Sequence, residues 1–135
     1  MVINIDKLSK IMGRQLTNEE LERIMYFEEA AKDPIVIKKA NAISNEEDYY
    51  GPIMAACRKR AELSQEKLAL MLNYSTSKIA KIETNNQPVK MDFLMEWSKS
   101  TNSPDFALGM MYGKIGIIAM MNKLKSEGYK VVIKR

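Results

Sequence analysis

The chain of 135 residues contains no histidine and only one cysteine, Cys57. The commonest general base and the commonest metal ligand of proteins are therefore both missing. A single cysteine cannot form a disulfide within the chain, and a free cysteine usually behaves as a small buried apolar residue. No carboxylate lies beside a glycine-rich loop or a nucleophile motif, so we expect no enzymatic activity, no metal site and no cofactor.

Long hydrophobic runs are also missing. Apolar residues make up 46% of the chain, which is ordinary for a globular protein, but they come in short groups separated by charges. No stretch approaches the roughly 18 consecutive apolar residues of a membrane span. The first residues show no basic region followed by an apolar run, which is the form of a signal peptide. We therefore expect a cytoplasmic protein with no membrane partner.

The net charge of +4 is distributed unevenly along the chain. Residues 1–48 contain 7 Lys/Arg and 10 Asp/Glu, a net charge of −3, whereas residues 49–135 contain 14 and 7, a net charge of +7. A basic segment suits a polyanionic partner and an acidic one does not. The charge pattern therefore favours a nucleic acid as the partner of residues 49–135.

Apolar residues at helical spacing predict short amphipathic helices throughout. Three are expected at about 4–12, 18–32 and 34–43, the second opened by a capping box of Thr17 and Glu20 and the third by Pro34. After an acidic connection, six more are expected at about 51–61, 64–72, 75–82, 91–97, 103–111 and 115–124. Residues 129–135 are rich in strand formers and are the only strand candidate. The predicted fold class is all-α.

Residues 63–83 read as two short helices joined by a tight turn, a geometry in which the second helix enters the DNA major groove. Ala69 is small where the second helix crosses close over the first. Asn73 occupies a turn position that needs a positive φ, for which asparagine is the best choice after glycine. The apolar seam between the two helices is expected to comprise Leu68, Leu72, Ile79 and Ile82.

Residues of about 53–111 resemble the Cro/XRE, or lambda-repressor-like, helix-turn-helix domains of phage repressors and bacterial transcription regulators. The matching pieces are Arg58-Lys-Arg-Ala-Glu-Leu-Ser-Gln65, Leu68-Ala69, Asn73-Tyr-Ser75, Ile79, Ile82-Glu83 and the loop Asn85-Asn-Gln-Pro88. The sequence departs from the family at Asn73, which replaces the usual turn glycine, and after Glu83, where the usual Asn-Gly is missing. The resemblance implies a five-helix DNA-binding domain over 49–112, preceded by an acidic helical extension over 1–48. Residues 113–135 would add a helix and a short strand as a possible dimerisation segment.

The resemblance also assigns roles to individual residues. It implies base contacts from Thr76, Ser77, Lys78 and Lys81. It implies phosphate contacts from Gln65, Thr84, Asn85 and Asn86. Arg58 and Glu83 match a structural ion pair. Simpler roles stay open, because exposed lysines are often only solvated and short hydroxyls favour the first turn of a helix.

These observations predict a sequence-specific double-stranded DNA-binding regulator of transcription, of the type of a phage or mobile-element repressor. One alternative is an antitoxin whose residues 1–48 bind a protein toxin, and another is a protein-binding adaptor that uses the helices as a scaffold. A homodimer is expected because residues 115–124 are apolar over a wide arc and the 131–133 strand lacks a partner. The alternative is that the N-terminal helices cover that arc within one chain.

Overall fold

Residues 4–133 are described by a computed structural model, in which they form nine α-helices, one short 3₁₀-helix and no strand. The elements in chain order are α1 (Ile5–Met12), α2 (Asn18–Lys32), α3 (Pro34–Ala42), η1 (Glu46–Tyr49), α4 (Tyr50–Arg60), α5 (Gln65–Leu72), α6 (Thr76–Glu83), α7 (Met91–Ser100), α8 (Pro104–Met111) and α9 (Gly113–Ser126). The all-α class expected from the sequence is confirmed for these residues. None of the described helices is long and apolar enough to cross a membrane.

Side-chain caps fix where several helices begin. The expected capping box of α2 is present: the Glu20 amide donates to Thr17 Oγ1 at 3.1 Å, and the Thr17 amide donates to Glu20 Oε1 at 2.9 Å. Asp33 caps α3 ahead of Pro34. Ser64 and Ser75 cap α5 and α6 in the same way, each accepting from the third helical amide. Residues next to each helix start therefore help to specify where these helices begin.

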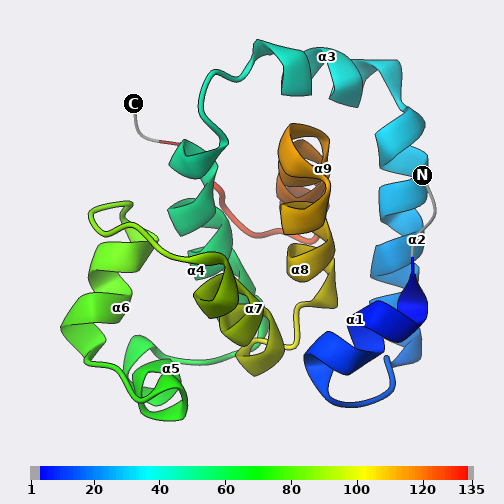
Figure 1. Ribbon diagram of the computed structural model, residues 1–135. Coiled ribbons are helices and arrows are strands. Elements are labelled where there is room, and N and C mark those ends of the chain that lie inside the picture. Colours follow the sequence, from blue (N-terminus) through cyan, green and yellow to red (C-terminus); the bar gives the residue numbers. More distant parts are fainter. Residues whose placement is uncertain (1–3, 134–135) are drawn as a thin grey trace.

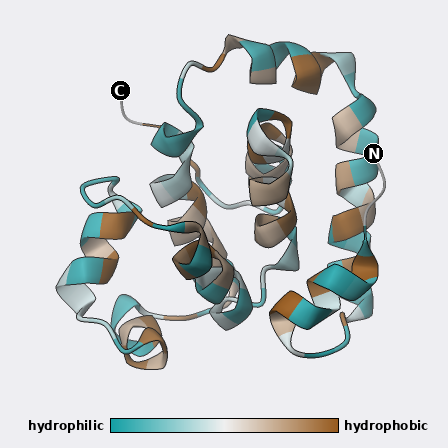
Figure 2. Ribbon diagram, viewed as in Figure 1, coloured by the Kyte–Doolittle hydropathy of each residue, from teal (hydrophilic) through white to brown (hydrophobic). Residues whose placement is uncertain are grey.

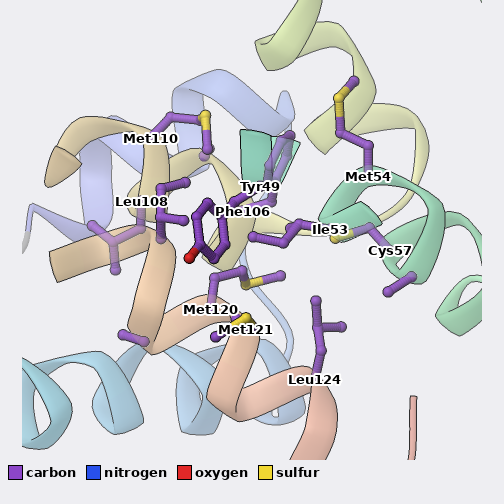
Figure 3. Packing of buried hydrophobic residues seen from close by; sticks show 14 of the residues in the cluster. Tyr49, Ile53, Met54, Cys57, Phe106, Leu108, Met110, Met120, Met121 and Leu124 are labelled. Carbon is purple, nitrogen blue, oxygen red and sulfur yellow. The ribbon is translucent and has the colours of Figure 1, made fainter. Parts of the chain in front are cut away.

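Helices α8 and α9 form a central hairpin that the other helices surround (Figure 1). Helices α2 and α3 pack on one side of it, α1 contacts α8, and α4 contacts α9. The hairpin is mostly apolar, whereas the surrounding helices carry polar residues on their outer sides (Figure 2). Side chains from α4, α8 and α9 meet around the buried Phe106 (Figure 3). One hydrophobic core therefore contains residues of all three sequence segments, 1–48, 49–112 and 113–135.

The apolar arc of α9 is covered by the chain itself. Ile117, Ile118, Met120 and Leu124 are all buried in the single chain, beneath α2, α3 and α8. This arc therefore gives no reason to expect a second subunit, and the homodimer itself stays a prediction. The N-terminal helices fold back and bury the arc, because their own apolar faces need the same cover.

The expected strand near the C-terminus is not formed in the described residues, and 129–133 are irregular. Val131 is buried in the core and Ile133 packs against it, while Val132 between them is 65% exposed. A strand needs a neighbouring strand for its backbone groups, and none is formed within residues 4–133. Lys134 and Arg135, which complete the predicted strand, lie outside the described residues.

A buried ion network ties the N-terminal helices to the basic part of the chain. Arg60 at the end of α4 donates to both carboxylate oxygens of Asp105 in α8, at 2.9 and 2.7 Å. It also donates to Glu127 after α9 at 3.0 Å, and Arg23 of α2 lies 3.4 Å from the same carboxylate. Burial alone would lower the pKa of Arg60, but Asp105 and Glu127 together raise it above its usual value. Charged residues of α2, α4 and α8, together with Glu127 after α9, therefore form one network of ion pairs.

Cys57 is fully buried on α4, as expected for a small apolar residue. Burial raises the pKa of its thiol to about 12. The reactive thiolate is therefore strongly disfavoured near neutral pH.

Candidate nucleic-acid interface

Helices α5 and α6 are joined by a turn whose geometry depends on Asn73. This residue adopts the left-handed conformation, with φ 59° and ψ 44°, as expected for the position that usually holds glycine. The Tyr74 amide then donates to the carbonyl of Ala69 at 2.8 Å, which closes the end of α5. Leu68, Ala69, Ile79 and Ile82 are buried between and beneath the two helices. The pair is therefore held by a tight turn and a small apolar seam.

The outer side of α6 bears short polar and cationic side chains. Ser77 and Lys81 are exposed and Thr76 is partly exposed, while Ile79, Ile82 and Glu83 face inward. None of the side chains of Thr76, Ser77 and Lys81 has a hydrogen-bond or ion-pair partner within residues 4–133. These three side chains are therefore available to an external partner.

Lys78 differs from the other three predicted base-contacting residues because its side chain has a partner within the protein. It lies on the flank of α6 that faces Tyr74, about 60° around the helix axis from Lys81, because successive residues turn by about 100°. The Lys78 ammonium lies over the ring of Tyr74, 4.1 Å from its centroid. Tyr74 in turn stacks on Phe93 of α7, with ring centroids 4.9 Å apart. Lys78 thus rests on an aromatic pair at the edge of the helix.

A buried ion pair anchors α6 to α4, as predicted from the sequence. Arg58 Nε donates to Glu83 Oε2 at 2.6 Å, and its Nη2 donates to Oε1 at 3.0 Å. Arg58 also donates to the carbonyl of Leu63 at 2.8 Å, which fixes the connection between α4 and α5. Both charged side chains are buried, so the bidentate geometry is held away from water.

Gln65 belongs to the same network. Its side-chain amide donates to Glu83 Oε1 at 3.0 Å, so the predicted phosphate-contacting residue also stabilises the ion pair. An amide nitrogen carries two hydrogens, which leaves the second one for an external acceptor. The backbone amide of Gln65 lies in the first turn of α5, where the helix dipole favours an anion.

Side chains of the loop after α6 form hydrogen bonds within the protein. Asn85 adopts φ 60°, accepts from the Gly51 amide at 2.9 Å, and donates to the Asp48 carbonyl at 2.7 Å. The Thr84 hydroxyl donates to the Ala80 carbonyl, and Asn86 donates to the Thr84 hydroxyl. Three predicted phosphate contacts are therefore engaged within the protein, although all three residues remain exposed.

A groove of about 700 Å³ opens beside this surface, between the α5–α6 turn, the flank of α6, the 87–90 loop and the start of α7. Its walls include Met71, Tyr74, Val89 and Phe93, with Lys78, Lys90, Asp92 and Glu96 around them. No group of three or more potential metal ligands occurs among the described residues. The groove is therefore lined by apolar, cationic and acidic side chains.

Sequence reasoning missed two features of this region. The Asn85 contacts to Gly51 and Asp48 join residues more than 30 positions apart, so no local pattern indicates them. The contact of Tyr74 with Lys78 does have a signal, because the two residues are four apart across a turn. Trp97 of α7 is fully buried, and its indole nitrogen donates to the Met54 carbonyl at 3.0 Å.

Comparison of the chain with family models, with curated proteins and with solved structures found no match.

Proposed function

We propose that the protein is a sequence-specific double-stranded DNA-binding regulator of transcription, most simply a repressor, and that α6 is its recognition helix. The observation that supports this most is the outer side of α6. Thr76, Ser77 and Lys81 project there without partners among the described residues, on a helix fixed by the buried Arg58–Glu83 pair. Free side chains on a rigid helix are what base recognition in the major groove requires.

In this proposal each residue of the surface has its own role. Lys81 donates to a guanine edge, and the Thr76 methyl packs on a thymine methyl. Gln65 donates to a phosphate through its backbone amide and its second side-chain hydrogen. Lys78, on the flank, reaches the phosphate strand more readily than the base edges. The net charge of +7 over residues 49–135 favours the approach of DNA.

The test is selection of bound sequences from random double-stranded DNA, followed by affinity measurements at moderate salt. Replacing Lys81 by alanine should weaken binding to the selected site by about 1–3 kcal/mol, roughly 5- to 150-fold, and relax the preference at one base position. Lys39→Ala on α3 removes the same charge from an exposed position on another helix and is the matched control. Unchanged affinity and preference of Lys81→Ala would refute the role of α6. Failure of the wild type to select any sequence would refute DNA recognition altogether and favour the adaptor.

An antitoxin is the second candidate, and one observation favours it. The acidic N-terminal helices expose Met25 (66%) and Ile35 (64%), which are large apolar side chains on α2 and α3. Because α1–α3 pack on α8 and α9, a toxin would have to bind their outer surface and not a free arm. Met25→Gln together with Ile35→Gln would abolish toxin binding and leave DNA binding unchanged.

A further inference from the structure

The ring of Tyr74, just before the N-cap residue of α6, contacts side chains of two different helices. It stacks on Phe93 of α7, with ring centroids 4.9 Å apart and ring planes inclined by 17°. The ammonium of Lys78, four residues further along the chain, lies 4.1 Å from the centroid of the Tyr74 ring. The ring therefore joins α7 to the lysine on the flank of α6.

The stacked pair is anchored in the core of the protein. Phe93 meets Trp97 edge to face, with ring centroids 5.9 Å apart. Trp97 is fully buried, and its indole nitrogen donates to the carbonyl of Met54 in α4 at 3.0 Å. Three rings in series thus connect the core to the surface, where Tyr74 is 38% exposed. Because the outermost ring is held from behind, a cation that rests on it is held as well.

The contact with the ring restricts a side chain that is otherwise flexible. A lysine has a four-carbon stem, and ordering that stem on binding lowers the affinity for a partner. The attraction between ring and ammonium orders Lys78 before any partner arrives. An ammonium has three N–H donors, and a ring covers one side of it, so donors remain for a phosphate oxygen. The contact therefore prepares Lys78 for phosphate binding.

The ring also keeps Lys78 from the carboxylates nearby. Asp92 and Glu96 line the same groove as Lys78, yet neither forms an ion pair with it within residues 4–133. Without the Tyr74 ring, a mobile ammonium in this groove would be drawn toward these carboxylates. An ammonium paired in that way is less available to DNA.

We propose that Tyr74 is a positioning residue for DNA binding: its ring, stacked on Phe93, holds Lys78 ready to donate to a phosphate of the DNA backbone. This inference rests on the proposed role of α6 in DNA recognition. Tyr74 acts through Lys78 and not through its own hydroxyl.

The experiment is a double-mutant cycle of Tyr74→Leu and Lys78→Ala, measured as affinity for the site selected from random double-stranded DNA. Tyr74→Leu should weaken binding about 2- to 5-fold, the strength of an exposed contact between a cation and a ring. The same substitution should have no further effect in the Lys78→Ala background. Tyr74→Phe keeps the ring, removes the hydroxyl and should bind as the wild type does.

Lys90→Ala is the matched control. Lys90 lines the same groove and is exposed, but no aromatic contact of Lys90 occurs among the described residues. Its effect on affinity should be the same with and without Tyr74→Leu. The salt dependence of binding identifies the partner of Lys78: the slope of log affinity against log salt concentration should become shallower by about 1 in Lys78→Ala, as for one lost phosphate contact.

Two outcomes would overturn the role of Tyr74 and leave DNA recognition by α6 intact. An equal loss from Tyr74→Leu with and without Lys78 would show that the ring supports only the fold. An equal loss from Tyr74→Phe and Tyr74→Leu would assign the effect to a direct contact of the hydroxyl. A wild type that selects no DNA sequence would overturn the proposed function and this inference with it, so the two failures are distinguishable.

Discussion

Arg58 and Glu83 lie 25 residues apart in the chain and meet in a buried pair that fixes the orientation of α6. Replacing Arg58 by methionine leaves a buried carboxylate with Gln65 as its remaining side-chain partner. We expect a loss of about 3–5 kcal/mol of unfolding free energy, because an unpaired buried charge is poorly compensated. Urea unfolding measures the difference, with Lys59→Met at the exposed neighbouring position as the control.

A double replacement distinguishes the pair from its separate members. Arg58→Met with Glu83→Leu removes both charges and should cost less than Arg58→Met alone. The same free energy for the wild type and each single variant would show that the two side chains are not coupled in solution.

At the scale of elements, α8 and α9 cross closely at two glycines. A Cβ added to Gly116 would collide with the carbonyl oxygen of Gly109 and lie 2.8 Å from its Cα, and neither atom can move away alone. Helix propensity by itself predicts that Gly116→Ala stabilises α9 by about 1 kcal/mol. We expect the opposite sign, a loss of about 1–3 kcal/mol or more, because the hairpin must separate.

Gly109→Ala provides a graded comparison on the other side of the crossing. Its added Cβ would meet the Gly116 carbonyl oxygen at 3.2 Å, which a small shift relieves. Its loss of stability should be the smaller of the two. A more stable Gly116→Ala variant in thermal unfolding would contradict the close crossing.

The elements that the sequence predicts well are those with local signals. Helix α2 begins after Thr17 and ends before Pro34 as expected, because the capping box and the proline act within a few residues. The prediction of a C-terminal strand was wrong for residues 129–133, because strand-forming residues need a partner strand, which local sequence cannot supply. In the candidate site, the turn at Asn73 and the Arg58–Glu83 pair were predictable from their motif. Two contacts were not predictable, because they involve elements outside that motif. Lys78 lies over Tyr74, which stacks on Phe93 of α7, and Asn85 donates to the carbonyl of Asp48 in η1.

At the scale of the whole molecule, the charge boundary near residue 48 does not coincide with a structural boundary. The acidic helices α1–α3 cover the central hairpin, and the basic α4 reaches the same hairpin from another side (Figure 1). Arg60 joins these parts, since it binds Asp105 of α8 and shares Glu127 with Arg23 of α2. Residues 4–133 should therefore unfold as one cooperative unit.

The substitution Arg60→Met tests whether residues 4–133 unfold as one cooperative unit. The substitution leaves Asp105, which is fully buried, without its cation, and we expect the loss of about 3–5 kcal/mol that follows removal of one partner of a buried pair. The midpoint of thermal unfolding should fall by roughly 10–20 °C for a chain of this size. Two probes are followed together: circular dichroism reports all helices, and fluorescence of Trp97, the only tryptophan, reports α7 and its contact with α4. Both midpoints should fall by the same amount, while Lys114→Met, at an exposed position on α9, leaves both unchanged. If circular dichroism showed an earlier transition that Trp97 did not follow, the N-terminal helices would unfold separately, and the shared core and ion network would not couple the acidic and basic parts of the chain.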